Sequence, residues 1–321
     1  MKLSICIPAY NEAANLPLAV EQVERLFARG GQGEGPLQEY ELEIVVTDNA
    51  SSDATWAVIQ ELSRSRVYLK GYRFSRNFGY QNSIFAGLSL ATGDAVIELD
   101  ADLEDPPTVI PRFVERWREG YEVVYGVRAK RFAPWYMKVL FATFYKLLHW
   151  ISDLKIPERT GDFRLLDRKV VEVLKSLPER NLYLRGLVTY LGFRQCPVVY
   201  DRQPRVSGES KFRILHYLVL AIDAVTAFTK APLRLMGALG AILFVLALAL
   251  SAYYVVGFFL HGREVPGFTS LVVLMLFLHS VTFIFLGVLG EYLSRVFDDS
   301  KFRPRVIIAD AVNVSRFPQS L

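Results

Sequence analysis

Four carboxylate side chains fall within six residues of the segment Asp100-Ala-Asp-Leu-Glu-Asp-Pro-Pro107. Like charges this close repel each other, which raises their pKa values and costs stability. A bound divalent cation removes that cost, because Mg²⁺ and Mn²⁺ take carboxylate oxygens and usually bridge substrate phosphates. The alternative is an acidic surface turn in which the two prolines stop a strand. The segment therefore predicts either a divalent metal site or such a turn.

Asp48 is a second candidate, because it follows the β-branched apolar run 42–46. A carboxylate at a strand end can accept the imide N–H of uracil or the equivalent N–H of guanine. The sequence contains neither G-x-x-x-x-G-K-[ST] nor G-x-G-x-x-G, which disfavours a P-loop or dinucleotide-binding fold. The four histidines are scattered and form no zinc-binding or triad pattern; they are His149, His216, His261 and His279.

The elements that would position these residues alternate between strands and helices. Short apolar runs predict strands at 3–8, 42–46, 67–74, 95–99 and 122–125, and helical patterns lie between them at 11–27, 53–64, 82–92 and 111–119. This alternation predicts a mostly parallel sheet covered on both faces, an α/β fold. In such sheets ligands bind at the carboxyl ends of the strands, where Asp48 and the acidic segment are expected.

The composition indicates a soluble part and a membrane part. The chain of 321 residues has a net charge of +4, two cysteines and a mean hydropathy of +0.23. Its 52% hydrophobic content excludes a disordered chain, and two cysteines exclude a disulfide-stapled secreted module. Residues 236–260 contain no charged side chain, and neither do residues 268–290. Each run is long enough to cross a bilayer core of about 30 Å; the alternative is a pair of buried helices in a soluble core.

The short connection 261–266 predicts a helical hairpin, and basic residues before and after it predict that both ends face the cytoplasm. Two further stretches, 134–151 and 212–230, mix aromatic, aliphatic and lysine residues and predict amphipathic helices in the membrane interface. Ordinary core-facing helices remain the alternative for both. The expected domains are a catalytic domain at 1–133 and 154–210, interface helices at 134–153 and 211–233, two transmembrane helices at 234–293, and a cytoplasmic tail at 294–321.

Five motifs occur in a fixed order: Asp48-Asn-Ala-Ser-Ser-Asp-Ala-Thr55, Ser75-Arg-Asn-Phe-Gly-Tyr-Gln81, the acidic segment, Gly161-Asp-Phe-Arg-Leu165 and Arg205-Val-Ser-Gly-Glu-Ser-Lys211. Together they resemble glycosyltransferase family 2, in its polyisoprenyl-phosphate glycosyltransferase branch with dolichyl-phosphate mannose synthase and GtrB-type enzymes. The resemblance covers residues 3 to about 293. It implies a Rossmann-like GT-A fold, a nucleotide-sugar donor, Mg²⁺ or Mn²⁺, and a lipid-phosphate acceptor.

The resemblance also implies roles for individual residues. Residues matching the nucleotide-sugar site are Pro8, Tyr10, Asn11, Glu12, Asp48 and Asp100. The expected metal ligands are Asp102 and Glu104, although the family often has glutamine at the second position. The expected catalytic residues are Asp102, Asp162 and Arg128, with Asp162 as a base, an acceptor-orienting group or merely the ion-pair partner of Arg164. The expected acceptor-phosphate ligands are Arg128, Arg131, Arg164, Arg205 and Lys211; for Arg128 and Arg131 the alternative is a contact with anionic lipid headgroups.

The expected reaction is the inverting transfer of a hexose, from UDP-glucose or a related UDP-sugar, to polyprenyl phosphate. A GDP-mannose-dependent mannose synthase and a non-catalytic membrane scaffold with a degenerate nucleotide-sugar fold are the alternatives. A processive polysaccharide synthase is disfavoured, because the chain lacks Q-x-x-R-W and further spans. The expected location is the bacterial plasma membrane with the catalytic domain in the cytoplasm. The expected partners are the nucleotide sugar, the polyprenyl phosphate, the bilayer, a second copy in a dimer or tetramer, and a flippase, but no nucleic acid.

Overall fold

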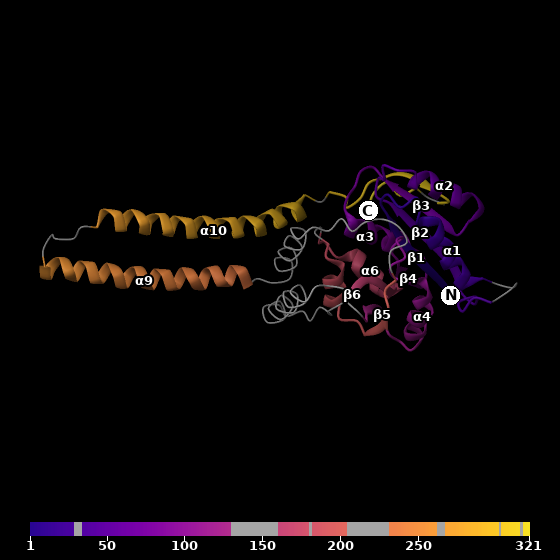
Figure 1. Ribbon diagram of the computed structural model, residues 1–321, viewed down its shortest axis with the longest axis horizontal. Coiled ribbons are helices and arrows are strands. Elements are labelled where there is room, and N and C mark those ends of the chain that lie inside the picture. The colour runs from indigo at the N-terminus through magenta and orange to yellow at the C-terminus, as the bar shows by residue number, and fades with distance from the viewer. Residues whose placement is uncertain are drawn as a thin grey trace. The chain divides into compact units, whose positions relative to one another are not determined.

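The computed structural model describes residues 1–28, 34–129, 160–179, 182–203, 231–261, 267–301, 303–314 and 317–321. The chain divides into two compact units (Figure 1). The first comprises Met1–His149, Leu154–Arg213 and Phe302–Leu321, and the second comprises Trp150–Asp153 and Ile214–Lys301. The predicted interface helices fall almost wholly outside the described residues, and Arg131, Arg205 and Lys211 lie outside them too.

In the described part of the first unit, eight strands form one sheet with the order β7-β5-β6-β4-β1-β2-β3-β8. Neighbours β3, β2, β1 and β4 are parallel, whereas β6 and β8 run antiparallel to the strands beside them. The prediction of a mostly parallel sheet is therefore confirmed. The strands are β1 (Lys2–Ala9), β2 (Glu41–Asp48), β3 (Leu69–Phe74), β4 (Ala95–Glu98), β5 (Val123–Arg128), β6 (Thr160–Asp167), β7 (Gln195–Tyr200) and β8 (Ile308–Val312).

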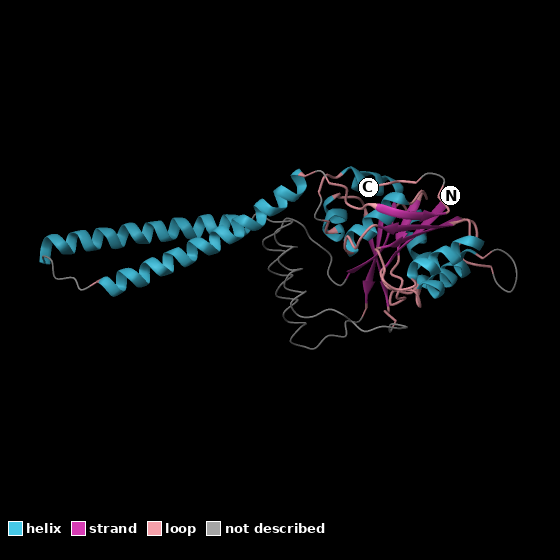
Figure 2. Cartoon of the chain, turned by 90° about the horizontal axis from the view of Figure 1, so that it is seen from above, coloured by secondary structure: helices cyan, strands magenta, loops and turns pink. Residues whose placement is uncertain are grey.

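Helices cover both faces of this sheet (Figure 2). Leu3, Ile5 and Ile7 of β1 point into one apolar core with side chains of α1, α2 and α4. Alternate residues point to the other face, where α3 packs closely enough that a Cβ on Gly87 would lie 3.2 Å from the Cβ of Cys6. The helices of this unit are α1 (Leu16–Phe27), α2 (Thr55–Ser65), α3 (Tyr80–Leu90), η1 (Pro107–Val109), α4 (Ile110–Arg118), α6 (Arg168–Ser176) and α7 (Leu184–Tyr190).

Residues 303–314 and 317–321, predicted as part of the cytoplasmic tail, belong to the first unit, called the catalytic unit below. β8 pairs antiparallel with β3 at the edge of the sheet. The amide Nδ2 of Asn313 donates to the carbonyl oxygens of Ser63, Arg66 and Leu69 at 2.7, 3.0 and 3.0 Å. Arg305 donates to the carbonyl oxygen of Glu179 at 2.9 Å. The end of the chain is therefore part of the folded domain that carries the site.

The second unit contains two long antiparallel helices, α9 (Ala231–His261) and α10 (Phe268–Ser300) (Figure 1). They include both apolar runs of the sequence, and α10 extends seven residues beyond residue 293, the predicted end of the transmembrane helices. In the described residues, the segment Phe277–Ser300 is long and apolar enough to cross a membrane, and Leu235–Leu250 is apolar but shorter. Large apolar side chains such as Phe244, Phe259 and Phe283 are 64–80% exposed, as expected for helices that face lipid.

Candidate active site

Three loops follow β1, β2 and β4 at the same edge of the sheet, because these strands are parallel. Each loop contains one non-glycine residue with a left-handed backbone: Asn11, Ala50 and Leu103, with φ angles of 58°, 57° and 57°. Such a conformation costs about 1 kcal/mol or more per residue, and strained residues of this kind gather at functional sites. The local backbone therefore marks this edge as the candidate site, where the sequence predicted it.

Hydrogen bonds join the loop after β1 to the loop after β2. The backbone N–H of Asn49 donates to the carbonyl oxygen of Ala9 at 2.9 Å. The backbone N–H of Asn11 donates to Ser51 Oγ at 2.9 Å, and Asn11 Oδ1 in turn accepts from the N–H of Ser52 at 2.9 Å. These reciprocal bonds fix the two loops against each other.

Asp48, the last residue of β2, is fully buried. Its Oδ1 accepts from the backbone N–H of Ser51 at 2.9 Å. Its Oδ2 lies 3.5 Å from Arg73 Nε and has no hydrogen-bond partner among the described residues. A buried acceptor left unsatisfied costs about 1–3 kcal/mol, so this oxygen is suited to accept an N–H from a bound molecule such as a nucleobase.

The other residues predicted to hold the nucleoside lie at the same edge. Pro8 is buried in β1 opposite Thr47 of β2. Tyr10 is 45% exposed, so its ring is accessible to a ligand. Glu12 Oε2 accepts from the side chain of Asn15 at 2.7 Å. The structure thus brings Pro8, Tyr10 and Glu12 to the loops that surround Asp48.

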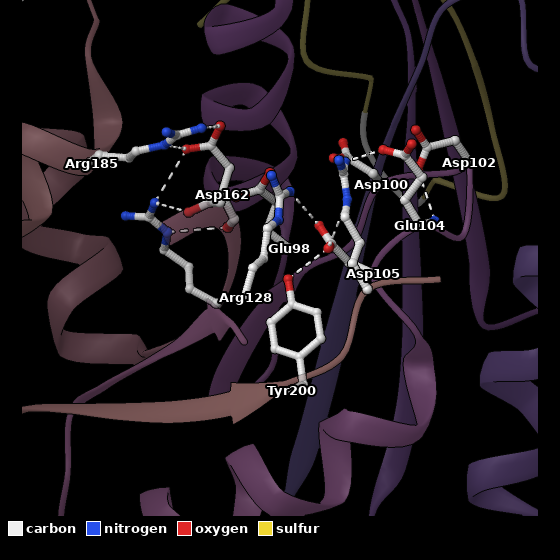
Figure 3. A network of polar contacts seen from close by, with 12 residues as sticks. Glu98, Asp100, Asp102, Glu104, Asp105, Arg128, Asp162, Arg185 and Tyr200 are labelled. Carbon is white, nitrogen blue, oxygen red and sulfur yellow. Dashed lines mark hydrogen bonds and ion pairs between the residues drawn. The ribbon is translucent and has the colours of Figure 1, made fainter. Parts of the chain in front are cut away.

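The acidic segment, residues 100–107, begins the loop after β4 and is called the acidic loop below. Asp105 anchors this loop from inside the protein. Its Oδ2 accepts from Arg128 Nη2 at 3.0 Å, and its Oδ1 accepts from the Tyr200 hydroxyl at 2.6 Å (Figure 3). Arg128 ends β5 and Tyr200 ends the neighbouring β7, so two strands hold the loop that follows β4. Gly161 leaves room for this arginine, because a Cβ there would lie 2.8 Å from Arg128 Nη2.

Asp102 and Glu104 lie side by side on the same loop, and the backbone N–H of Glu104 donates to Asp102 Oδ1 at 3.1 Å (Figure 3). Both side chains are partly exposed. Two carboxylates on an open loop fit Mg²⁺ or Mn²⁺, which commonly take one or two protein carboxylates and fill the other positions with substrate phosphates and water. Arg202 pairs with Glu104 and lies 3.7 Å from Asp105 Oδ1, so a metal ion would compete with this guanidinium. Within the described ranges, no group of three His, Cys, Asp or Glu side chains could hold a metal ion.

Asp100 lies at the start of this loop, and its Oδ1 accepts from the Tyr80 hydroxyl at 2.7 Å. Burial of the carboxyl group and the nearby charge of Asp102 raise the pKa of Asp100 to about 7. Asp100 is therefore only about half ionised near neutral pH. The acidic loop consequently carries less negative charge than its number of carboxyl groups suggests.

Asp162 on β6 is buried and held by two arginines (Figure 3). Arg185 of α7 makes a bidentate pair with it, Nε to Oδ1 at 2.9 Å and Nη2 to Oδ2 at 3.0 Å. Arg164 Nη2 also donates to Oδ1 at 3.2 Å, and Gln81 Nε2 lies 3.5 Å from Oδ2. Burial alone would raise the pKa of Asp162, but the two guanidinium groups outweigh it and lower the pKa. Asp162 therefore stays ionised.

The structure gives some predicted residues other partners than expected. Arg164 is 5% exposed and directs its guanidinium to Asp162 and to the carbonyl oxygen of Gly161, at 3.0 Å, so its predicted contact with an acceptor phosphate stays a prediction. Arg128 pairs with Asp105, and its predicted roles in catalysis and in binding the acceptor phosphate stay predictions. Sequence reasoning did not identify four residues that hold the site: Tyr80, Arg185, Tyr200 and Arg202. Only Tyr80 lay within one of the quoted motifs.

Comparison with known proteins agrees with this architecture. The Glycosyl transferase family 2 profile matches residues 4–175, and the GtrB C-terminal hairpin profile matches residues 231–296. An uncharacterized glycosyltransferase of Synechocystis sp. is 40% identical over 99% of this chain and 98% of its own length. A bactoprenol glucosyl transferase of Shigella phage SfX is 40% identical over 96% of this chain and 99% of its own length.

Among solved structures, a Pyrobaculum calidifontis mannosyltransferase in complex with GDP-Man and Mn²⁺ is 18% identical, with a TM-score of 0.48 over 94% of this chain and 87% of its own. The profile match covers more than half of this chain, and the 40% identity extends over nearly all of it. The chain therefore belongs to glycosyltransferase family 2, and its residues 231–296 form a GtrB-type hairpin.

Proposed function

We propose that this glycosyltransferase transfers glucose from UDP-glucose to bactoprenol phosphate, a polyprenyl phosphate, giving the glucosyl phospholipid and UDP. The observation that carries the proposal is the combination, in one chain, of an acidic site at the strand ends and an apolar helical hairpin. Relatives with the same two parts over nearly their full length are named bactoprenol glucosyl transferases. An enzyme with one aqueous and one lipid substrate needs both parts.

The donor nucleoside would lie on the loops after β1 and β2. Asp48 Oδ2, buried and without a hydrogen bond among the described residues, is placed to accept the imide N–H of uracil. Asn11 is locked to Ser51 and Ser52 and shapes the floor of this subsite. Asp100 and Tyr80 then lie beside the ribose and the diphosphate.

Asp102 and Glu104 would hold Mg²⁺ or Mn²⁺, which when bound neutralises charge on the departing diphosphate. Asp105 supports both by fixing the loop through Arg128 and Tyr200. Arg202 must leave Glu104 when the cation binds, because both occupy the same carboxylate. Of these three carboxylates, Asp102 and Glu104 would thus be metal ligands and Asp105 anchors the loop.

The acceptor phosphate needs positioning rather than deprotonation. Its second pKa is near 6, so at pH 7 it is already largely dianionic. Asp162 is a poor base because two arginines hold it ionised with a lowered pKa; we assign it the role of orienting Arg185 and Arg164. A phosphate oxygen attacks the anomeric carbon, the new C–O bond forms as the bond to UDP breaks, and the electron pair leaves with UDP. One displacement inverts the anomeric configuration.

The hairpin explains how the lipid reaches the site. Removing a polyprenyl tail from the bilayer costs about 0.8 kcal/mol per CH₂, so the phosphate must react at the headgroup plane. We propose that α9 and α10 insert in the bacterial plasma membrane, with the catalytic unit on the cytoplasmic side. The basic residues that follow the second run support this orientation.

A donor panel tests the proposal. Purified full-length protein in detergent is incubated with undecaprenyl phosphate, Mn²⁺ and either UDP-glucose, UDP-galactose, UDP-N-acetylglucosamine or GDP-mannose, and lipid products are identified by mass. A hexosyl phospholipid formed fastest from UDP-glucose is expected. Faster transfer from GDP-mannose would favour a mannose synthase, and no lipid product from any donor would refute the proposed function.

A further inference from the structure

Two glutamates are buried in the central strands of the sheet, one on each side of β1. Glu43 on β2 is 1% exposed and Glu98 on β4 is 2% exposed. Their backbones lie opposite Ser4 and Cys6 of β1, respectively. Burying an ionised carboxylate is costly unless it is paired and hydrogen-bonded, so the surroundings of each side chain decide whether it carries a proton.

Glu43 has every partner that an ionised carboxylate requires. Its oxygens accept from Lys70 Nζ at 2.6 Å and from Ser4 Oγ at 2.5 Å. They also accept from the N–H and the hydroxyl of Thr92 at 2.7 and 2.8 Å. Burial would raise the pKa of Glu43, but these donors outweigh it and lower the pKa to about 2.

Glu98 has no such partners. In the part of the chain that the structure describes, no Lys or Arg nitrogen lies within 4.0 Å of its carboxylate, and its polar neighbour is the Tyr80 hydroxyl at 3.5 Å. The two cations whose charges favour an ionised Glu98, Arg164 of β6 and Arg185 of α7, are bonded to Asp162. Burial, and then the charges of Asp162 and Asp100, raise the pKa of Glu98 well above its usual range.

The groups that face Glu98 come from every element packed against it. Asp100 lies two residues further along the chain, at the start of the acidic loop. Asp162 and Arg164 come from β6, Arg185 from α7 and Tyr80 from α3, and the Cys6 thiol comes from β1. Glu98 lies in the same cluster as Asp162 and Asp100 (Figure 3). Most of these neighbours disfavour a negative charge on Glu98, and the two cations that favour one are already shared with Asp162.

We propose that Glu98 is a positioning residue that holds a proton and donates it in a hydrogen bond to the Tyr80 hydroxyl, so that Tyr80 in turn donates to Asp100. Tyr80 has a single hydroxyl proton, and its oxygen lies 2.7 Å from Asp100 and 3.5 Å from Glu98. If both carboxyl groups were ionised they would compete for that proton. A proton on Glu98 makes the hydrogen bonds run in one direction, from Glu98 to Tyr80 to Asp100. This fixes Asp100 where the donor is expected to bind.

This inference rests on the proposed function only for the role of Asp100. A proton on Glu98 also keeps one negative charge away from a site that must accept a nucleoside diphosphate and a phosphate dianion. When rising pH removes that proton, Asp100 loses its fixed partner and the donor meets a further negative charge. The KM for the donor should therefore rise at alkaline pH, with a smaller change in kcat.

The first experiment detects the proton directly. Infrared spectra of the full-length protein in D₂O near neutral pD are compared with those of Glu98→Gln, and of Glu43→Gln as the matched control. In Glu98→Gln the carbonyl-stretch band of un-ionised carboxylic acid should lose the contribution of Glu98, which leaves that of partly protonated Asp100. In Glu43→Gln the band should persist unchanged. An identical acid band in wild type and Glu98→Gln would overturn the proposal.

The second experiment tests the positioning role through the pH dependence of donor KM. Glutamine resembles a protonated glutamate, so Glu98→Gln should keep donor KM and kcat within about twofold of wild type at neutral pH and remove the alkaline rise in KM. Tyr80→Phe should raise donor KM about tenfold at all pH values while keeping the acid band. An alkaline rise unchanged in Glu98→Gln would overturn the positioning role. A protein that shows the acid band but transfers no sugar would refute the proposed function alone.

Discussion

Replacing Glu43 by glutamine should lower the free energy of unfolding of the catalytic unit by about 3 kcal/mol. The pKa of Glu43 falls from 4.5 to about 2 on folding, because Lys70, Ser4 and Thr92 outweigh the effect of burial. Each pKa unit corresponds to about 1.36 kcal/mol, so ionised Glu43 contributes about 3 kcal/mol. Because the folded pKa is the lower one, this contribution is complete above pH 4.5 and disappears as the pH falls from 4.5 to 2.

The assay is urea unfolding of the full-length protein in detergent, followed by tryptophan fluorescence, at several pH values. Wild type should exceed Glu43→Gln by about 3 kcal/mol at pH 7, and the two should converge towards pH 2. Glu98→Gln is the matched control with the opposite sign. Because the folded pKa of Glu98 is raised, wild type should lose stability relative to Glu98→Gln as the pH rises above 4.5. A Glu43→Gln deficit that does not change between pH 7 and pH 2 would show that ionised Glu43 is not the source of this stability.

Three further substitutions follow from the contacts of the site. Arg202→Gln removes the guanidinium that competes for Glu104. Mn²⁺ should therefore bind about fivefold more tightly, the equivalent of about 1 kcal/mol for a partly exposed ion pair, as measured by electron paramagnetic resonance without donor. An unchanged Mn²⁺ affinity would contradict the idea that Arg202 and the metal ion share this carboxylate. Arg185→Ala leaves Asp162 with Arg164 and the 3.5 Å contact to Gln81. The substitution should cost about 2 kcal/mol of unfolding free energy and lower kcat without changing Mn²⁺ affinity. A loss of Mn²⁺ binding would place Asp162 among the metal ligands. Asn313→Ala removes the amide that donates to three carbonyl oxygens beside β3 and places alanine at a φ of 55°. Thermal unfolding should therefore show that the catalytic unit loses about 2 kcal/mol of unfolding free energy. A stability equal to that of wild type would mean that the tail does not anchor the domain.

The first half of the fold could be predicted because its strands are apolar runs that end at polar residues. β1, β2 and β4 are buried on both faces, which produces continuous runs of apolar side chains. β6 could not be predicted in this way, because Asp162 and Arg164 interrupt its pattern and are buried only as a pair. β8 is short and lies at the edge of the sheet, and its partner β3 is distant in sequence.

The same distinction, between residues with a local sequence signal and residues without one, applies to the candidate site. The carboxylates of the acidic loop and Asp48 were predicted because each lies directly after an apolar strand. Arg185 and Tyr200 carry no local signal, since each acquires its role from a residue that only folding brings near: Asp162 is 23 positions from Arg185, and Asp105 is 95 positions from Tyr200. Glu98 reads as one polar residue in an apolar strand, and its importance depends on the absence of a counter-ion among the described residues.

The metal-binding role of the acidic loop can be tested by the Mn²⁺ dependence of sugar transfer to undecaprenyl phosphate. The transfer is compared in wild type, Asp102→Asn and Asp310→Asn and scored by the mass of the lipid product. Asp310 lies exposed on β8 and serves as the control for loss of one carboxylate. We expect Asp310→Asn to match wild type and Asp102→Asn to lose transfer by at least about 100-fold, because the charge on the departing diphosphate is no longer neutralised. Full transfer by Asp102→Asn at every Mn²⁺ concentration would contradict the assignment of the acidic loop as the metal-binding centre of the reaction.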